Sequence, residues 1–366
     1  MAVPSVLTDS YDALLTTTAR NYMPRLRNNI SKGNKVLAWL QDRGRMRGVD
    51  GGERVQVPLL YGLNDTADIY SGYGVLKVTP QDGITSAFYT WCQISVSVTI
   101  SRKEERQNSG QSRLLSLLQS KLMQAEVSGR ELLNNCLVSG RISSGASSTD
   151  GAFVARVGSM DSGAQAPLPL TALIDATPSR SRTDIGNINP STYSWWQNQM
   201  LQSAATTFAG LKQEMTDLYT RCAKGAGGSP DLGICDRLLW VTYFNSLQNQ
   251  ERFVRTDDRT VNVLGGSMAL AFFDAALTWD EVVPDVKTNA DAVDSVGTIS
   301  KSTLYFINSE CMEWIYDTET NWINTPFVRP LDQDARTSQL LWMGVMGTNN
   351  RRKNGVLKNV AQNIVS

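Results

Sequence analysis

A strand pattern passes directly into a helical pattern in residues 92–138, CQISVSVTISRKEERQNSGQSRLLSLLQSKLMQAEVSGRELLNNCLV. From Gln93 to Ile100 polar and apolar residues alternate without interruption, which is the two-residue period of a half-buried strand. Ser101 follows and is a suitable helix cap. The helical stripe consists of Leu114, Leu115, Leu118, Leu122, Val127, Leu132, Leu133 and Leu137. A helix of about thirty residues, roughly 45 Å long, is expected here unless Gly110 or Gly129 bends it.

A second strand pattern lies before this segment. Apolar residues alternate with other residues from Arg54 to Tyr61, imperfectly at the end. About thirty residues without a regular period separate this strand from the one at Ile94–Ile100, and they include the glycine- and tyrosine-rich stretch Tyr70–Gly74. Loops of that length are usually functional. The sequence therefore predicts a long projecting hairpin formed by these two strands.

The second half of the chain mixes helices with short strands, so the expected class is α+β. Apolar residues from Phe208 to Cys222 follow the helical period and end before the cluster Gly225–Gly228. Further strands are predicted at Leu238–Tyr243, Thr303–Ile307, Gln339–Met346 and Gly355–Val360. The last two of these flank a polar, basic turn and are expected to pair with each other in antiparallel fashion.

Composition and charge restrict the classes of protein. The 366 residues are enough for two cores, because a single core rarely grows beyond roughly 250 to 300 residues. Lys plus Arg and Asp plus Glu both total 35, so the whole chain has no net field that attracts nucleic acid, and any contact with DNA must be local. The most apolar stretch, Leu264–Leu277, is interrupted by Asp274 and is too short to cross a bilayer. We expect no secretory signal, no membrane span and a cytoplasmic protein.

Residues 1–50 are expected to form an N-terminal arm that leads into short helices. From Arg20 to Asp50 the acidic residues are Asp42 and Asp50. They face eight basic residues, Arg20, Arg25, Arg27, Lys32, Lys35, Arg43, Arg45 and Arg47. This cationic stretch is either a solvated face or a surface that meets DNA or an acidic partner.

The residues needed for common catalytic sites are missing. The chain has no histidine, which excludes Ser-His-Asp and Cys-His nucleophilic sites and histidine-based zinc motifs. No phosphate-binding GxxxxGK[ST] sequence is present, and the cluster Gly225–Gly228 lacks the context of a dinucleotide fingerprint. The five cysteines stand far apart, so buried free thiols are expected. We predict no catalytic residue, no cofactor and no metal site.

Nine tryptophans are many for this length, and Trp195 and Trp196 are adjacent. Two interpretations are open. They are core residues, or some of them anchor contacts between subunits, because Trp, Tyr and Arg dominate the energetics of interfaces.

The order of these segments resembles a known family, the major capsid proteins of tailed bacteriophages, whose fold was first described for the Hong Kong phage. Two local sequences support the resemblance. Asn187–Trp196 is similar to the beginning of the second half in podophage-type coat proteins. Arg329–Arg336, followed by a strand and Asn349–Arg352, is similar to their ending.

The resemblance implies five regions along the chain. They are an N-terminal arm (1–50), an extended loop (51–100), a spine helix and peripheral domain (101–185), an axial domain (186–325), and C-terminal strands that return to the peripheral domain (326–366). The extended loop would lie over a neighbouring subunit, and the axial domain would meet its copies around a capsomer axis.

The resemblance also implies the function and the partners. The chain would form hexamers and pentamers of an icosahedral head that encloses double-stranded DNA, assembled in the host bacterial cytoplasm and retained in the virion. Its partners would be copies of itself, scaffolding, portal and decoration proteins, and packaged DNA in loose, nonspecific contact, with no membrane. Candidate subunit contacts are Arg25, Arg27, Tyr70, Tyr73, Lys77, Trp195 and Trp196. Some family members join subunits covalently through a lysine of the extended loop, and Lys77 is the only lysine between Glu53 and Ile100.

Three alternatives remain. Another multimeric phage part is possible, although a tail-tube subunit is usually a smaller β-barrel and a portal is larger and more helical. A cytoplasmic enzyme that uses Lys, Asp, Glu, Cys or Tyr would need a concave pocket with perturbed titrating groups. A DNA-binding module that uses the basic arm would bind with a strong dependence on salt.

Overall fold

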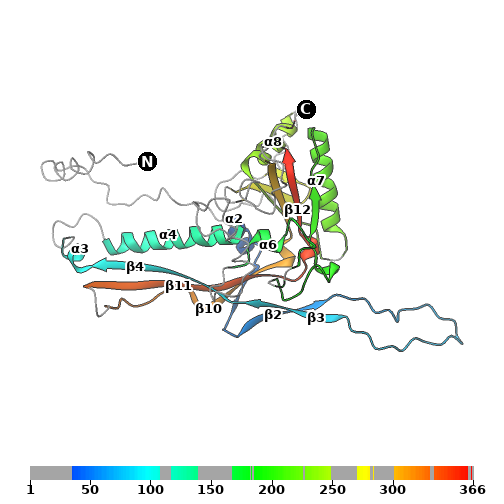
Figure 1. The fold of residues 1–366 in the computed structure, drawn as a ribbon, viewed down its shortest axis with the longest axis horizontal. Helices are drawn as coiled ribbons and strands as arrows, with labels where there is room; N and C mark the ends of the chain where they lie inside the picture. Colours follow the sequence, from blue (N-terminus) through cyan, green and yellow to red (C-terminus); the bar gives the residue numbers. More distant parts are fainter. Residues whose placement is uncertain are drawn as a thin grey trace.

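The computed structural model describes residues 35–107, 117–138, 167–181, 183, 185–225, 227–248, 270–280, 283, 301–329, 334–361 and 364. These residues form three parts (Figure 1). A long sheet lies beneath the helix α4, a second sheet with the helices α7 and α8 stands at one end of it, and a thin hairpin projects away from both.

The long sheet has four strands in the order β1-β10-β11-β4. β10 pairs antiparallel with β11 and parallel with β1, and β11 pairs antiparallel with β4. Its strands are β1 (Met46–Val49), β4 (Cys92–Ser101), β10 (Met312–Asn324) and β11 (Ala335–Thr348). The helices of this part are α2 (Lys35–Asp42), α3 (Arg102–Gln107), α4 (Leu117–Val138) and α6 (Leu170–Leu173).

The second sheet has six strands in the order β5-β12-β9-β6-β8-β7. α7 packs on β12 and β5, and α8 packs on β8 and β9. The strands are β5 (Gln199–Gln202), β6 (Leu232–Cys235), β7 (Leu270–Phe272), β8 (Ala275–Trp279), β9 (Lys301–Ile307) and β12 (Gly355–Ala361), and the helices are α7 (Phe208–Ala223) and α8 (Arg237–Gln248). The helix predicted over Phe208–Cys222 and the strand predicted at Thr303–Ile307 are confirmed.

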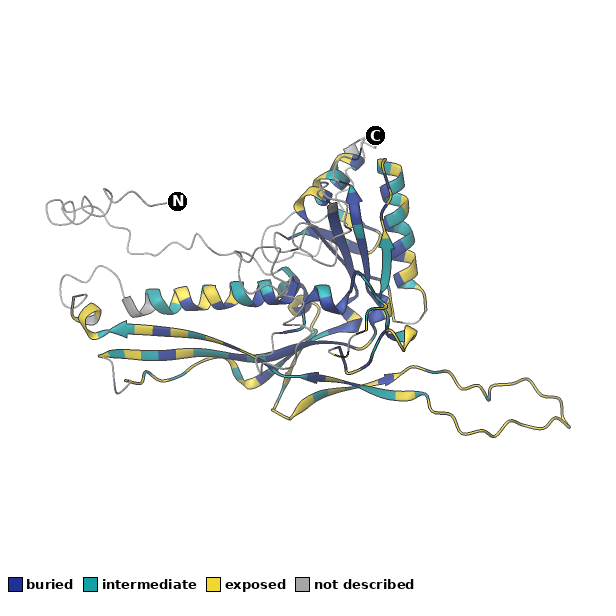
Figure 2. Ribbon diagram, viewed as in Figure 1, coloured by how far each residue is buried: buried dark blue, intermediate teal, exposed yellow. Residues whose placement is uncertain are grey.

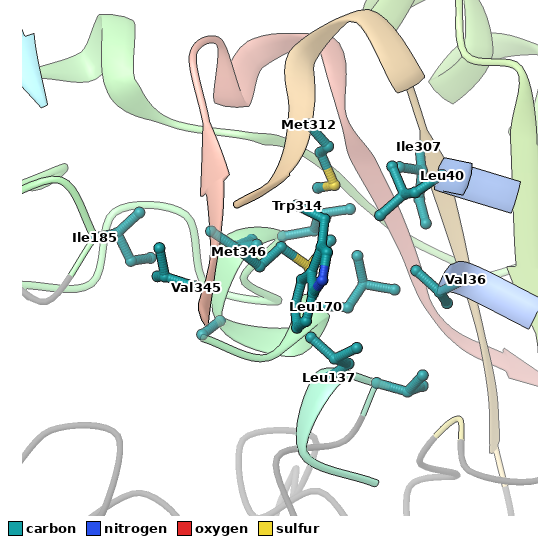
Figure 3. Packing of buried hydrophobic residues seen from close by; sticks show 14 of the residues in the cluster. Val36, Leu40, Leu137, Leu170, Ile185, Ile307, Met312, Trp314, Val345 and Met346 are labelled. Carbon is teal, nitrogen blue, oxygen red and sulfur yellow. The ribbon is translucent and has the colours of Figure 1, made fainter. Parts of the chain in front are cut away.

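Two apolar clusters match the expectation of two cores. One lies between α7, α8 and the six-stranded sheet. The other extends from the long sheet into the base of the six-stranded sheet. Figure 3 shows its centre, where Leu40 of α2, Leu137 of α4 and Leu170 of α6 surround Trp314 and Met346. Because helices from three distant parts of the sequence contribute to one cluster, this core joins the long sheet to the rest of the chain.

The helix α4 runs along β4 and is held on the sheet by a lysine hydrogen bond and by the close packing of a glycine. Lys121 near its start donates to the Thr99 carbonyl at 3.1 Å, and Gly129 in its middle lies against Val96. The ring of Trp322 fills the space beside Gly129, where a Cβ atom would lie 2.6 Å from the ring. Trp322 has φ +54° and stands at a register shift in β10. Gly129 therefore forms a notch for Trp322 within a continuous helix, and it does not end α4.

The predicted cap at Ser101 is confirmed. The Ser101 hydroxyl accepts from the Glu104 N–H at 3.2 Å, and the Ser101 N–H donates to the Glu104 carboxylate at 3.3 Å, which is a capping box. Lys121 lies 2.8 Å from the same carboxylate and lowers the pKa of Glu104. α3 ends at Gln107, and residues 108–116 lie outside the described residues, together with the predicted break at Gly110.

The predicted strand pairing of the hairpin is wrong. The strand β2 (Arg54–Leu60) pairs with β3 (Ile84–Thr90), whereas β4 pairs with β11 in the long sheet. Nine residues of the segment 51–100, Cys92 to Ile100, therefore belong to the long sheet. Alternation identifies a strand and its buried face, but it does not identify the partner strand.

Two further predictions are wrong. Leu238–Tyr243 lies within α8, because a short apolar run fits a helix as well as a strand. The two terminal strands, β11 and β12, do not pair with each other and belong to different sheets. The polar turn between them contains the short helix Arg351–Lys353, whose first and last side chains are buried. The connection thus passes through the core, which the polar composition of the turn did not suggest.

The notch at Gly129 gives a first prediction. Gly129→Ala should destabilise the subunit by about 1–3 kcal/mol, because the added methyl group collides with the Trp322 ring, and this outweighs the gain in helix propensity of about 1 kcal/mol. The measurement is urea unfolding of the subunit. Ser128→Ala, at the exposed neighbouring position, is the control and should leave stability unchanged or slightly higher. Equal stability of the Gly129→Ala variant and the parent chain would contradict the contact.

Asp236 gives a prediction about pH. It precedes α8, accepts from the Ser302 hydroxyl at 2.9 Å, and is buried, which raises its pKa above the ordinary value of 3.8. The fold therefore favours the protonated form, whose contribution is complete below pH 3.8 and is lost as the pH rises through the folded-state pKa. Asp236→Asn keeps a capping side chain and should melt higher than the parent at neutral pH but not in acid. A pH-independent difference in melting temperature would contradict this.

Candidate assembly surface

The hairpin carries the most exposed apolar side chains of the described chain. β2 and β3 pair from Arg54↔Thr90 to Leu60↔Ile84, and beyond them the chain continues outward as an extended loop (Figure 2). Within this loop the exposed fractions of Ile69, Tyr73, Val75 and Val78 are 100%, 104%, 97% and 90%. Single exposed apolar residues are ordinary, but a projecting segment that carries so many marks a contact surface.

The base of the hairpin is firmly held. The Tyr89 hydroxyl donates to the Thr348 carbonyl at 2.6 Å and accepts from the Thr348 N–H at 3.1 Å. The Trp91 indole donates to the Gly52 carbonyl at 2.7 Å, and the Phe88 N–H donates to the Gly186 carbonyl at 3.1 Å. Tyr89 is buried, and burial raises its pKa well above the ordinary value. The tip of the loop is therefore exposed, whereas the paired strands at its base are fixed by hydrogen bonds to the rest of the subunit.

A glycine pair joins the hairpin to the long sheet. Gly51 and Gly52 have φ +66° and +106°, a backbone region that favours glycine. The Gly51 N–H donates to the Asp317 carboxylate at 3.3 Å. That carboxylate also accepts from Thr320, whose hydroxyl is the main cause of the lowered pKa of Asp317. The Gly51–Gly52 turn, which leads from β1 to β2, is therefore bonded to Asp317 of β10.

The two adjacent tryptophans have different places. Trp196 is buried and donates from its indole to the Ile185 carbonyl at 3.2 Å, which is the core interpretation. Trp195 is half-buried and stacks on Tyr61 at the start of the loop, with ring centroids 5.2 Å apart. The pair therefore connects the interior to the root of the hairpin.

The other predicted contact residues are partly placed. Tyr70, Tyr73 and Lys77 lie together in the loop and are exposed. Lys77 forms an exposed ion pair with Asp68, with 3.0 Å between Nζ and Oδ2. Arg25 and Arg27 lie outside the described residues. Sequence reasoning missed the most exposed aliphatic residues, Leu63, Ile69, Val75 and Val78, although their place in a long irregular segment was a usable signal.

Chemical groups in the described residues show no arrangement that could hold a metal through three acidic, cysteine or histidine side chains. All five cysteines are free and buried, as expected. Burial raises the pKa of Cys92 and of Cys222 to about 12, so these thiols stay protonated at neutral pH. Among the described helices, none is long and apolar enough to cross a membrane.

Comparison with known proteins gives a fold and no sequence relative. No protein-family model matches the chain, and no curated protein matches it. The capsid asymmetric unit of cyanophage A-1(L) is similar with a TM-score of 0.60 and 12% identity, over 94% of this chain and 98% of that chain. The holo-SrpI encapsulin complex from Synechococcus elongatus PCC 7942 has a TM-score of 0.52 and 11% identity, over 99% and 97%. Gordonia phage Cozz has a TM-score of 0.52 and 12% identity, over 95% and 93%.

These likenesses cover nearly the full chain, and they define the class of structure. The chain has the α+β fold of phage major capsid proteins, which the order of its segments had indicated. The same fold occurs in an encapsulin.

The root of the hairpin gives a prediction. Tyr89→Phe removes the hydroxyl that pairs both backbone groups of Thr348 and should destabilise the subunit by about 1–3 kcal/mol, because those groups are buried. Amide hydrogen exchange of residues 84–90 should become faster. Tyr61→Phe is the matched control, because its hydroxyl bonds to the Asp82 carbonyl on the exposed side and its loss should change little. Unchanged exchange in the Tyr89 variant would show that this contact does not hold the hairpin.

Proposed function

We propose that this chain is a capsid subunit that assembles into hexamers and pentamers of an icosahedral phage head around double-stranded DNA. The observation that carries the proposal is the extended loop, whose bare apolar side chains stand on a rigid base. The protein is structural in this proposal, and its location is the virion after assembly in the host cytoplasm.

The direction of the loop supports contact with another copy. It extends away from the body of its own subunit, and its apolar side chains are exposed there (Figure 2). In this proposal a neighbour covers them, so the loop and its receiving surface are different patches of the chain. Contacts of this head-to-tail kind close into rings when the rotation between subunits allows it.

The rigid base of the loop lowers the entropy cost of binding, so a small contact area can still give stable assembly. Ordering a flexible loop on binding costs roughly 0.5–1.5 kcal/mol for each immobilised side chain, and a strand pair that is already anchored reduces this cost. In the same proposal the axial domain, about residues 186–325, meets its copies around the capsomer axis, and the candidate contacts Tyr70, Tyr73 and Lys77 lie against a neighbour. Scaffolding, portal and decoration proteins are the further partners.

The contents of the shell are a separate question, because the same fold occurs in an encapsulin as well as in phage capsids. A chain with 35 basic and 35 acidic residues has no net attraction for DNA. We expect loose, nonspecific contact with packaged DNA, and DNA that resists nuclease inside purified particles is the finding that would distinguish a phage head from a shell with other contents.

The test is assembly of the expressed chain, alone and with neighbouring genes, followed by sedimentation and negative-stain microscopy. The parent should form closed shells or rings. A variant with Ile69→Ser, Tyr73→Ser, Val75→Ser and Val78→Ser should keep the melting temperature of the subunit, because these side chains are exposed, and should lose assembly. Each lost apolar contact removes roughly 1–2 kcal/mol per interface.

The matched control changes the same positions while keeping them apolar, as Ile69→Leu, Tyr73→Phe, Val75→Ile and Val78→Ile. It should assemble. The proposal fails if the parent chain remains a stable monomer under all conditions. It also fails if the serine variant forms shells at the parental yield.

A further inference from the structure

The helix α4 runs antiparallel to the strand β4, and two contacts fix the level of one against the other. Lys121 bonds to the Thr99 carbonyl, and Gly129 packs against Val96, so the residue number on β4 falls as that on α4 rises. Figure 1 shows α4 lying along β4. The last turns of α4 therefore lie over the beginning of β4.

Two cysteines stand at the same level of this contact. Cys136 follows Gly129 by seven residues, which corresponds to about 10 Å along the helix. Cys92 precedes Val96 by four residues, which corresponds to about 13 Å along the strand. Measured from the contact between Gly129 and Val96, the two positions thus agree to within about 3 Å along the helix axis.

Both cysteine side chains point into the contact. Seven residues are about 20° short of two helical turns, so Cys136 stands on the same side of α4 as Gly129. The two-residue period of a strand puts Cys92 on the same face of β4 as Val96. The exposed fraction of each cysteine is 3%. The two thiols therefore face each other between the helix and the sheet.

The influence of one thiol on the other agrees with this placement. Burial is the main cause of the raised pKa of Cys92, and the Cys136 thiol raises that pKa further, because two neighbouring thiolates would repel. Burial also raises the pKa of the described cysteines Cys222, Cys235 and Cys311, but in these the further influences come from charged residues and not from a second thiol.

The helix α4 lies close to β4, which a short bridge requires. A disulfide needs Cα atoms about 4.4–6.8 Å apart. Ala125 and Gly129, one helical turn apart on the side of α4 that faces the sheet, are both small. A Cβ atom on Gly129 would lie 3.3 Å from the Val96 side chain, so the helix backbone packs directly on the side chains of the strand.

We propose that Cys92 and Cys136 form a disulfide that locks α4 onto β4 after the assembled shell leaves the reducing cytoplasm. Both side chains are thiols in the structure. Thiols stay reduced inside a cell, whereas disulfides persist outside it. The pairing stands on the geometry of α4 and β4, and only its timing rests on the proposed function.

The reaction is thiol–disulfide exchange, with a small soluble disulfide as the oxidant. One cysteine attacks the reagent as a thiolate, forms a mixed disulfide and releases one small thiol. The other cysteine then displaces the second small thiol and closes the bridge. The protein loses two electrons and two protons, and the reagent takes them up as two thiols. Because both sulfurs are buried, α4 must lift before the reagent enters, and the reaction takes on the order of hours.

The first test uses the full chain, purified in reductant and then incubated with oxidised glutathione at neutral pH. After unfolding and alkylation the parent should carry three alkylated cysteines of its five. Digestion should yield the Cys92 peptide joined to the Cys136 peptide. A bridge that involves another cysteine, or a stable glutathione adduct on Cys92 or Cys136, would overturn the pairing.

A second incubation removes the obstacle of burial. Urea below the unfolding midpoint raises the population of locally opened states, in which α4 is lifted from the sheet. The bridge should then form at least about tenfold faster than without urea. Five alkylated cysteines after both incubations would overturn the proposal.

Alanine variants separate the lock from ordinary packing, because each variant is compared with itself in the reduced and oxidised states. Oxidation should raise the melting temperature of the parent by at least about 4 °C, since the bridge constrains the unfolded chain. It should leave the melting temperatures of Cys92→Ala and Cys136→Ala unchanged. Cys311→Ala removes a similarly buried thiol and should respond as the parent does. A parent that melts no higher after oxidation would show that the bridge does not lock α4.

Purified particles test the timing. Shells released from cells directly into alkylating reagent should have both thiols alkylated, and shells kept afterwards with oxidised glutathione should carry the bridge. A bridge that is already complete in the cell would overturn the timing. Absence of shells from the parent chain would refute the proposed function, whereas the pairing is measured on the subunit and would stand.

Discussion

A buried guanidinium, that of Arg351, fixes the turn through which the chain passes from the long sheet to the second sheet. It is fully buried and donates to the carbonyls of Leu173, Trp196 and Ala172 at 2.9, 3.1 and 3.3 Å and to the side chain of Asn198 at 3.3 Å. A charge in a core is tolerated only when its donors are satisfied, so removal of these acceptors would be costly. Arg351 lies between the last strand of the long sheet and the last strand of the second sheet. Its bonds therefore fix the turn between β11 and β12 against α6 and against the segment that leads into β5.

Lys353 performs a related role two residues later. Its ammonium group is buried and donates to the carbonyls of Ala223, Lys224, Gly225 and Gly228, of which Gly225 is the nearest at 2.9 Å. Carbonyls at the end of α7 have no partners within the helix, and a cation is the favourable group to satisfy them. One short turn thus fixes both the junction of the sheets and the end of a helix that packs on the second sheet. That turn is one of two short connections between the sheets, the other being the segment from β9 to β10, and it begins beside Thr348, which anchors the hairpin.

These two cations also show where sequence reasoning ends. Periodicity predicted β2, β4 and α7 because each has a clear buried face, and a short apolar run predicted β9, which is buried on both faces. Ser101 was recognised as a cap because the capping box is local in sequence. Partner strands could not be predicted, because alternation is equally satisfied by β3 or β11. The turn Thr348–Asn354 reads as exposed because it is polar and basic, and its burial depends on carbonyls that lie more than a hundred residues away. The extended loop was predicted, but its anchor at Tyr89 was not, because the bonding partner Thr348 lies 259 residues further along the chain.

A subunit of this kind must remain soluble before it assembles, and the form of the loop shows how. Its apolar residues are carried on a thin extended chain, so they do not merge into one broad apolar patch of the kind that drives aggregation. Asp65, Asp68 and Asp82 stand among them, and Pro58 blocks one edge of the hairpin. The strands β3 and β4 follow one another along a single extended run of chain, with Trp91 between them (Figure 1). Two strands that run end to end cannot pair side by side, so one copy cannot bond the edge of β3 to the edge of β4.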